Sequence, residues 1–263
     1  MQPLELLKTR FQINTGERMH MIPTIRDIIK EGGVRQLYRG GLPEITGLIP
    51  RATAALSTLE FSRRTFKSWN ANNQLTTSYA YLSGAMSGTV ESFVFSPFQV
   101  IKVRLMAKEH LGRYKNTMDC LHQVVAKEGL RALFIGIMPT IYRNSLWNSI
   151  YYGTMYQLET HHMPKLQSES LQAARSFAVG LTVGFTATCF NAPFDVVKSR
   201  IQSQLPGQEK YTRTSQALTA IYREEGLAAL YKGFLPKALR LGIGQTIGLM
   251  LFNHSLAYME REE

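Results

Sequence analysis

The stretch PFDVVKSR, residues 193–200, occurs twice more in this chain in related form, as PLELLKTR from Pro3 and as PFQVIKVR from Pro97. Each copy has a lysine five residues after the proline and an arginine seven residues after it. Self-similarity at a fixed period indicates a chain built from repeated structural units. The sequence therefore predicts one domain, 1–263, made of three repeats.

A second pair of motifs follows each copy in the same register. The Glu-Gly pairs stand at 31–32, 128–129 and 225–226, and the aromatic-x-Gly triplets begin at Tyr38, Phe134 and Tyr231. Soluble solenoid repeats are usually about 20 to 50 residues long, so the longer period here argues against them. We expect each repeat to contain a long helix, a short amphipathic helix, the triplet and a second long helix. The expected bounds of the repeats are 1–70, 71–165 and 166–263.

Three long segments carry no formal charge. They are 176–194, 144–158 and 241–259, the last with a neutral His254. Their lengths approach the ~20 residues that a helix needs to span a bilayer. They also contain Asn, Gln, Thr, Ser and Gly, which predicts helices that line a wet cavity on one face. Small residues four apart, at Gly84/Gly88 and Gly180/Gly184, would let neighbouring membrane helices approach closely.

The net charge of +11 predicts an anionic partner, which would be a nucleic acid, a phospholipid or an acidic solute. The membrane-length segments argue against a nucleic-acid binder. The two cysteines have no spacing typical of a metal site or a disulfide framework. Because no catalytic Ser/His/Asp constellation or phosphate-binding glycine loop stands out, we expect neither an enzyme nor a metal or cofactor site.

The repeated pattern resembles that of the mitochondrial carrier family, P-x-[DE]-x-x-[KR]-x-[KR], then [DE]-G, then aromatic-[KR]-G, over essentially the whole chain. The resemblance implies an all-α membrane protein with six transmembrane helices in a bundle of three-fold pseudosymmetry, with short matrix helices. It further implies a monomer of the inner mitochondrial membrane that exchanges small anionic metabolites by alternating access. Only two residues precede Pro3, so we expect the first helix to be truncated, most simply by an incomplete sequence.

Proline would kink each odd-numbered helix, and an acid and a base three residues apart share one helix face. Three such helix ends would form a ring of ion pairs that closes the cavity on the matrix side. The expected matrix-gate residues are Pro3, Glu5, Lys8, Pro97, Gln99, Lys102, Pro193, Asp195 and Lys198. Gln99 replaces an acid, which predicts a weaker closure with an amide–ammonium hydrogen bond at best; alternatively, Gln99 only braces Lys102. Only Glu60 and Arg63 resemble the cytoplasmic gate of the family.

Seven residues after the triplet glycines stand Gly47, Arg143 and Arg240, at positions that the resemblance assigns to substrate contacts. Charges at mid-membrane are costly and usually functional, and guanidinium groups bind carboxylates in a bidentate manner. Two arginines facing one cavity therefore predict a substrate with two carboxylates, and Arg51 could add a third positive charge. Alternatively, an arginine pairs with a cavity acid such as Glu91, which could itself pair with a cation in the empty state or carry a proton.

The segment RNSLWNSIYYG from Arg143, and the third repeat, resemble the 2-oxodicarboxylate carriers, especially the fungal ones. They imply substrates such as 2-oxoglutarate and 2-oxoadipate. The segment TGLIPRATAALSTLEF is more similar to tricarboxylate or succinate–fumarate carriers, and a degenerate, non-transporting carrier is a further alternative. Polar residues that could contact the substrate, or only bridge helices, are Asn144, Asn148, Tyr151, Asn191 and Gln245.

The triplet glycines open helices, whose free N–H groups and dipole attract anions. The resemblance implies cardiolipin phosphates at Gly40, Gly136 and Gly233. The triplet Phe134-Ile135-Gly136 lacks the basic residue that the other two have, which predicts a weaker lipid site there.

Overall fold

A computed structural model describes residues 2–14, 20–70, 74–110, 112–158, 160, 169–205, 207 and 210–239 of the chain. Every regular element in these ranges is a helix. The order of long helix, short helix and second long helix agrees with the order expected from the repeats. The chain is therefore all-α as far as the structure describes it.

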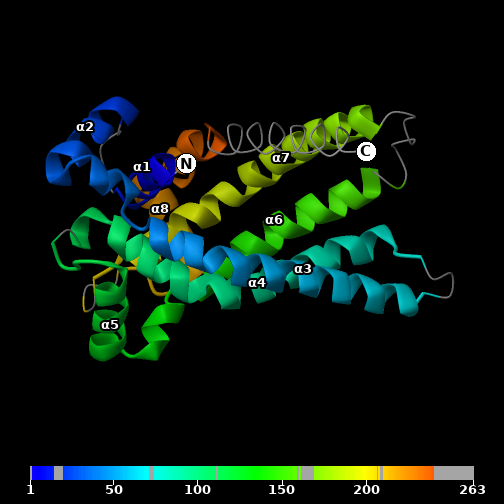
Figure 1. Ribbon diagram of the computed structural model, residues 1–263, viewed down its shortest axis with the longest axis horizontal. Helices are drawn as coiled ribbons and strands as arrows, with labels where there is room; N and C mark the ends of the chain where they lie inside the picture. The colour runs from blue at the N-terminus through cyan, green and yellow to red at the C-terminus, as the bar shows by residue number, and fades with distance from the viewer. Residues whose placement is uncertain are drawn as a thin grey trace, which may run out of the picture.

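Four long helices and the shorter α1 make up the body of the molecule in Figure 1. They are α1 (Gln2–Ile13), α3 (Gly41–Ser68), α4 (Thr77–Met106), α6 (Ile137–Gln157) and α7 (Glu169–Ser203). At about 1.5 Å per residue, α3, α4 and α7 are roughly 42 to 52 Å long, which exceeds the ~30 Å hydrocarbon core of a bilayer. In the described part of the chain, Ala174–Ser203 is the one segment that is long and apolar enough to cross a membrane by length and composition alone.

Three short helices gather at one end of the long ones, which we call the short-helix end (Figure 1). They are α2 (Met21–Gly32), α5 (Thr117–Glu128) and α8 (Thr214–Glu225). Each is followed by a 3₁₀ turn, namely η1 (Val34–Tyr38), η3 (Leu130–Phe134) and η5 (Leu227–Tyr231), and η2 (Lys108–His110) follows α4. The short helices pack through small apolar clusters, such as Val196 and Ile201 of α7 against Ala217 and Ile221 of α8.

Ion pairs explain why the two repeated motifs keep their register. The arginine seven residues after each repeat proline binds the glutamate of the Glu-Gly pair in the same repeat. The pairs are Arg10–Glu31 at 2.9 Å, Arg104–Glu128 at 2.5 Å and Arg200–Glu225. Each pair joins a short helix to the end of a long one. The number of residues between the two motifs is therefore fixed by the stretch of chain that must bring the arginine and the glutamate together.

A left-handed glycine ends each short helix. The φ angles are 72° at Gly33, 81° at Gly129 and 80° at Gly226, and each N–H donates to a carbonyl four residues earlier. This conformation favours glycine because it has no Cβ. In the first repeat the left-handed residue is therefore Gly33, one position beyond the Glu-Gly pair at 31–32.

The first pair of small residues brings α4 and α6 close together. A Cβ at Gly84 would lie 2.5 Å from the carbonyl oxygen of Asn148, and one at Gly88 would lie 2.4 Å from the carbonyl carbon of Asn144. For Gly180 and Gly184, the neighbours that the repeat register predicts lie outside the described residues. Gly84 and Gly88 therefore fix the α4–α6 contact that positions the cavity-facing side of α6.

We expect the pair at Glu225 to make stability depend on acid pH. Hydrogen bonds from Arg200 and Lys232 hold the pKa of Glu225 at about 2, against burial that acts to raise it from 4.5. A carboxylate with a lowered folded-state pKa stabilises the fold fully above its unfolded pKa, and this contribution is lost as the pH falls through the folded pKa. Glu225→Gln should therefore lower the melting temperature at pH 6 and flatten its fall between about pH 5 and 2, as measured by thermal unfolding in detergent.

Glu224→Gln is the matched control. Glu224 adjoins Glu225 but pairs with Lys210, and both of these side chains are about half exposed. Exposed ion pairs contribute little to stability, so this variant should leave both the melting temperature and its acid dependence nearly unchanged. An identical acid profile for the two variants would contradict the role given to Glu225.

Candidate functional site

The described helices enclose a cavity of about 410 Å³, to which α1, α3, α4, α6 and α7 all contribute side chains. Six of the lining side chains are cationic and two are acidic: Lys8, Arg51, Lys102, Arg143, Lys198 and Lys237, against Glu5 and Glu44. Such a cationic lining attracts anionic solutes. The cavity is surrounded by five of the six long helices expected from the sequence, and it is therefore the candidate binding site.

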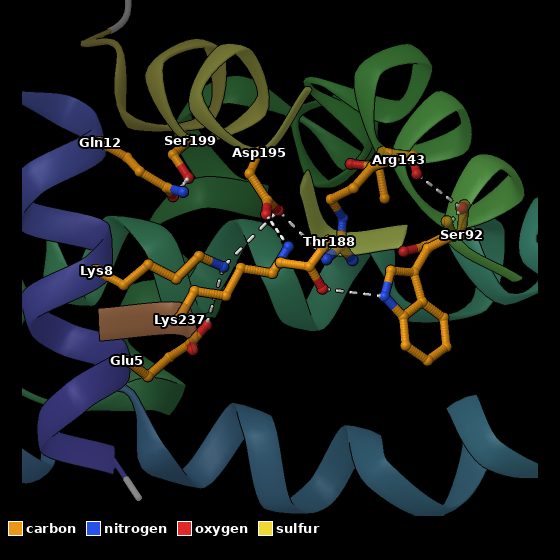
Figure 2. A network of polar contacts seen from close by, with 12 residues as sticks. Glu5, Lys8, Gln12, Ser92, Arg143, Thr188, Asp195, Ser199 and Lys237 are labelled. Carbon is orange, nitrogen blue, oxygen red and sulfur yellow. Dashed lines mark hydrogen bonds and ion pairs between the residues drawn. The ribbon is translucent and has the colours of Figure 1, made fainter. Parts of the chain in front are cut away.

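Two ion pairs of the expected ring are present at the short-helix end. Lys102 Nζ donates to Glu5 Oε1 at 2.9 Å, which joins the second repeat to the first. Lys8 Nζ lies 3.8 Å from Asp195 Oδ1, which joins the first repeat to the third (Figure 2). In both pairs the acid of one repeat meets the lysine of the next. The prolines Pro97 and Pro193 lie inside α4 and α7, and Pro3 lies in the first turn of α1.

The third position of the ring differs from the other two. Gln99 Oε1 is buried without a hydrogen-bond partner among the described residues, and Lys198 has neither an acidic nor a hydrogen-bonding partner among them. The amide–ammonium hydrogen bond expected as the best substitute is therefore not formed in this structure. Nor does Gln99 bind Lys102, whose ammonium contacts Glu5 and Glu44 in the described chain. The ring has two ion pairs and one open position.

Asp195 is the centre of the polar network at this end. Besides Lys8, it contacts Arg143, whose Nη1 lies 3.5 Å from Oδ1, and it accepts a hydrogen bond from Lys237 (Figure 2). Three cations from three different segments thus converge on one carboxylate that is almost completely buried. The Asp195 carboxylate therefore joins these three segments to α7 only while all three contacts are formed.

Sequence reasoning missed Lys237 and Glu44. Glu44 accepts a hydrogen bond from Lys102 at 2.6 Å, and it follows a proline just as Lys237 does. Aligned on the triplet glycines, the corresponding dipeptides are Pro43-Glu44, Pro139-Thr140 and Pro236-Lys237. The same alignment that singled out Arg143 would have revealed these charges three residues earlier, and they reinforce the two ion pairs already present.

Arg143 lines the cavity with a side chain that is 13% exposed, and its contact with a substrate stays a prediction. Its acidic partner in the described chain is Asp195 rather than Glu91, the example that the sequence suggested. Arg240 and Gln245 lie outside the described residues. Of the two arginines predicted at the triplet register, the structure therefore describes Arg143, and Arg51 is a second guanidinium group in the cavity lining.

Arg51, which lines the cavity, forms a second charged group with the buried Glu91. Arg51 Nε donates to Glu91 Oε1 at 2.5 Å, and Asn148 Nδ2 donates to Glu91 Oε2 at 2.8 Å. The guanidinium carbon of Arg51 also lies 4.9 Å from the centre of the Phe95 ring. Glu91 is therefore paired with a cation, which is one of the two roles expected for it. The Arg51 side chain is 34% exposed, so a solute can reach it.

Gly47 does not line the cavity and is buried against α4. A Cβ at this position would lie 2.5 Å from the Phe95 ring and 2.9 Å from that of Phe98. Gly47, expected to contact the substrate, is therefore not placed at the cavity, because the rings of Phe95 and Phe98 fill the space where its side chain would project. The positive charge on this helix is presented one turn later by Arg51.

The other polar candidates divide into two groups. Asn144, Asn148 and Asn191 line the cavity, and Asn191 Oδ1 has no hydrogen-bond partner among the described residues. Asn144 donates to Ser92 at 2.9 Å, so it bridges α6 and α4. Tyr151 is not among the lining residues; it stacks on Trp147 with ring centres 4.8 Å apart.

Glu60 and Arg63 are not joined in this structure. Glu60 pairs with Arg64 on the same exposed face of α3, whereas Arg63 donates to the carbonyl of Tyr152 at 3.5 Å. Only Arg63 reaches toward a neighbouring helix. The cytoplasmic gate stays a prediction, and this geometry favours Arg63 over Glu60 as its member.

The three triplet glycines adopt the left-handed conformation, with φ of 81° at Gly40, 73° at Gly136 and 81° at Gly233. Gly40 and Gly136 are the N-caps of α3 and α6. Gly136 adjoins a groove that also contains Arg213 and Thr214 at the start of α8. Arg213 thus supplies near Gly136 the cation that the triplet itself lacks, which the sequence comparison did not reveal.

Within the described ranges, no group of three or more His, Cys, Asp or Glu side chains could hold a metal ion. The two cysteines are apart and free: burial raises the pKa of the Cys120 thiol to about 12, which makes it unreactive near neutral pH. The chemistry of the described site is therefore that of ion pairing and hydrogen bonding to an anion.

Comparison with known proteins identifies relatives over nearly the whole chain. Residues 1–69, 73–165 and 169–263 match the mitochondrial carrier protein family. A probable mitochondrial 2-oxodicarboxylate carrier of Dictyostelium discoideum is 37% identical, over 95% of this chain and 83% of the relative. Mitochondrial citrate transporter D of Aspergillus niger is also 37% identical, over 96% of this chain and 86% of the relative. The human mitochondrial 2-oxodicarboxylate carrier is 33% identical, over 99% and 89%.

Proposed function

Because the chain belongs to the mitochondrial carrier family, whose members transport solutes, we propose that it exchanges 2-oxodicarboxylates such as 2-oxoglutarate and 2-oxoadipate. It is a mitochondrial membrane protein by family, and we place it in the inner membrane as a multi-pass monomer. Relatives named as 2-oxodicarboxylate carriers, similar over nearly the full length, support this substrate class. The observation that carries the proposal is Arg143, whose side chain is 13% exposed and faces a cavity with an excess of cations.

The network around Asp195 suggests how binding is coupled to opening. Arg143 pairs with Asp195, which also pairs with Lys8 and Lys237. A substrate carboxylate that binds Arg143 competes with Asp195 for the same guanidinium group. Binding therefore weakens one of the contacts that keep the short-helix end closed, and we assign this end to the matrix side. Arg240 is the expected anchor for the second carboxylate.

Exchange in liposomes tests this function directly. The purified protein is reconstituted into vesicles loaded with unlabelled 2-oxoglutarate, and uptake of labelled 2-oxoglutarate is followed. We expect uptake that requires internal substrate and is inhibited by 2-oxoadipate but not by a monocarboxylate of similar size. A protein that is folded by its thermal transition and takes up no di- or tricarboxylate would instead be a non-transporting member of the family.

Tricarboxylates are the second candidate class of substrate. The citrate transporter D of A. niger is as similar as the first relative in identity, and the cavity has more cations than two carboxylates need. Labelled citrate is therefore included in the same panel. A preference for citrate over 2-oxoglutarate would assign this second class.

Cardiolipin is the proposed lipid partner, at the N-termini that Gly40, Gly136 and Gly233 open. Left-handed glycines cap the N-termini of α3 and α6, where backbone N–H groups point outward, and Arg213 adds a positive charge near Gly136. Helix N-termini and basic side chains together favour phosphate. We expect added cardiolipin to raise the melting temperature in detergent, and Arg213→Ala to reduce that increase.

A further inference from the structure

Lys198 is distinct among the cations of the cavity. It is 9% exposed and lines the cavity, yet it has no acidic or hydrogen-bonding partner in the part of the chain that the structure describes. Each of the other lining cations has an acidic partner, as shown by Lys102 with Glu5, Arg143 with Asp195 and Arg51 with Glu91. The unpaired ammonium group is therefore not explained by the network that closes this end.

The reason for the missing partner lies in the second repeat. Glu5 meets the lysine of the second repeat and Asp195 meets that of the first, so the residue that would meet Lys198 is at position 99. A glutamine stands there, and its Oε1 is itself buried without a partner among the described residues. The carboxylate that would neutralise Lys198 is thus replaced by a neutral amide that does not bind it.

The charges around Lys198 favour the binding of an anion. The charges that act on it include three cations, Arg143, Lys8 and Lys102, and one carboxylate, Asp195. That carboxylate is already shared among Lys8, Arg143 and Lys237. Burying a charge without a partner is costly, and here the cost is increased by like charges nearby. An anion that enters the cavity and reaches Lys198 relieves this cost.

We infer that Lys198 is a specificity-determining residue that binds a third carboxylate, so that the cavity accepts tricarboxylates such as citrate as well as 2-oxodicarboxylates. The inference rests on the proposed carboxylate exchange and deepens it. A 2-oxodicarboxylate held by Arg143 and a second arginine leaves Lys198 unpaired, whereas a tricarboxylate has one carboxylate more. Asn191, whose Oδ1 also lacks a described partner, lines the cavity on the same helix and can accept a hydrogen bond from a substrate hydroxyl.

Exchange kinetics of the full chain in liposomes test this inference. For Lys198→Gln we expect the KM for citrate to rise about 10-fold or more, as for loss of one charge-assisted hydrogen bond. The KM for 2-oxoglutarate should change by less than about 3-fold, because no carboxylate of that substrate is lost from its partner. Gln99→Glu should likewise raise the KM for citrate relative to that for 2-oxoglutarate, since it supplies a carboxylate for Lys198 within the protein while it keeps the lysine.

Two control variants accompany the test. Lys198→Arg keeps the charge and should retain citrate exchange, and Lys108→Gln removes an exposed cation outside the cavity and should change neither KM. Melting temperatures in detergent show whether each variant folds. If Lys198→Gln does not fold, Gln99→Glu carries the test, because it adds an ion pair rather than removing a charge.

The outcomes separate the inference from the proposed function. A wild-type protein that exchanges 2-oxoglutarate but neither binds nor transports citrate overturns the inference and leaves the proposed function intact. Equal changes in both KM values, or a change in maximal rate alone, would assign Lys198 to the gate and also overturn it. A folded protein that exchanges neither solute overturns both.

Discussion

Arg143→Ala is expected to reduce exchange of 2-oxoglutarate by about 100-fold or more. A hydrogen bond to a charged group contributes about 1.5 to 3 kcal/mol, and a bidentate guanidinium–carboxylate contact contains two of them. The variant also takes one of three cations away from Asp195, so the coupling between substrate and closed end is lost. Initial uptake rates in liposomes over a range of external substrate concentrations measure the effect.

Two further variants show whether the loss is specific to the geometry at position 143. Arg143→Lys keeps the positive charge but loses the planar guanidinium group that binds a carboxylate through two N–H groups, so its rate should lie between those of Arg143→Ala and the wild type. Arg64→Ala removes an arginine whose side chain is 78% exposed on α3, and its rate should equal that of the wild type. A wild-type rate and KM for Arg143→Ala would remove the basis of the proposed site.

Gly88→Ala is expected to destabilise the protein strongly. The added Cβ would lie 2.4 Å from the carbonyl group of Asn144, so the backbones of α4 and α6 must separate. Overpacking of a tight interior costs about 1 to 3 kcal/mol, and we expect the upper end because the obstacle is backbone. For a protein of this size that corresponds to a fall in melting temperature of roughly 6 to 12 °C, measured by thermal unfolding in detergent.

Gly41→Ala is the matched control, because Gly41 also lies in a long helix, at the start of α3. A Cβ there would lie 3.6 Å from the Gln2 side chain, which is ordinary van der Waals contact. Alanine also favours the helix over glycine by about 1 kcal/mol. The melting temperature should therefore stay the same or rise slightly. Equal destabilisation of the two variants would contradict the close α4–α6 contact as the cause.

Repetition made much of the architecture predictable. Two motifs in register predicted the alternation of long and short helices, and the alignment of the repeats placed Glu5, Lys8, Lys102 and Asp195 at one end. These residues can be found from sequence because each repeat contributes the same position to the same layer. Arg143 was found in the same way, from its distance to a triplet glycine.

Contacts that break the symmetry were harder to predict. Gly47 shares its register with Arg143 but is covered by Phe95 and Phe98, which belong to a neighbouring helix. The pairing of Arg143 with Asp195 likewise depends on how far a flexible side chain extends between helices. Position along a repeat predicts which layer a residue occupies, but it does not predict which neighbour fills the space in front of it.

Two of the three arginines that bind the short-helix glutamates also bind across repeats. Arg10 Nε donates to the carbonyl of Met106 at 2.9 Å, and Arg200 Nε donates to that of Gln12 at 3.0 Å. Helix α1 of the first repeat is thereby bound to both the second and the third repeat, over sequence separations of 96 and 188 residues. During synthesis α1 must wait for α7 before its contacts are complete, and such distant closures make folding slow. A nascent chain that stops after two repeats therefore leaves exposed the surface of α1 that would bind α7, and chaperones and proteases can recognise it.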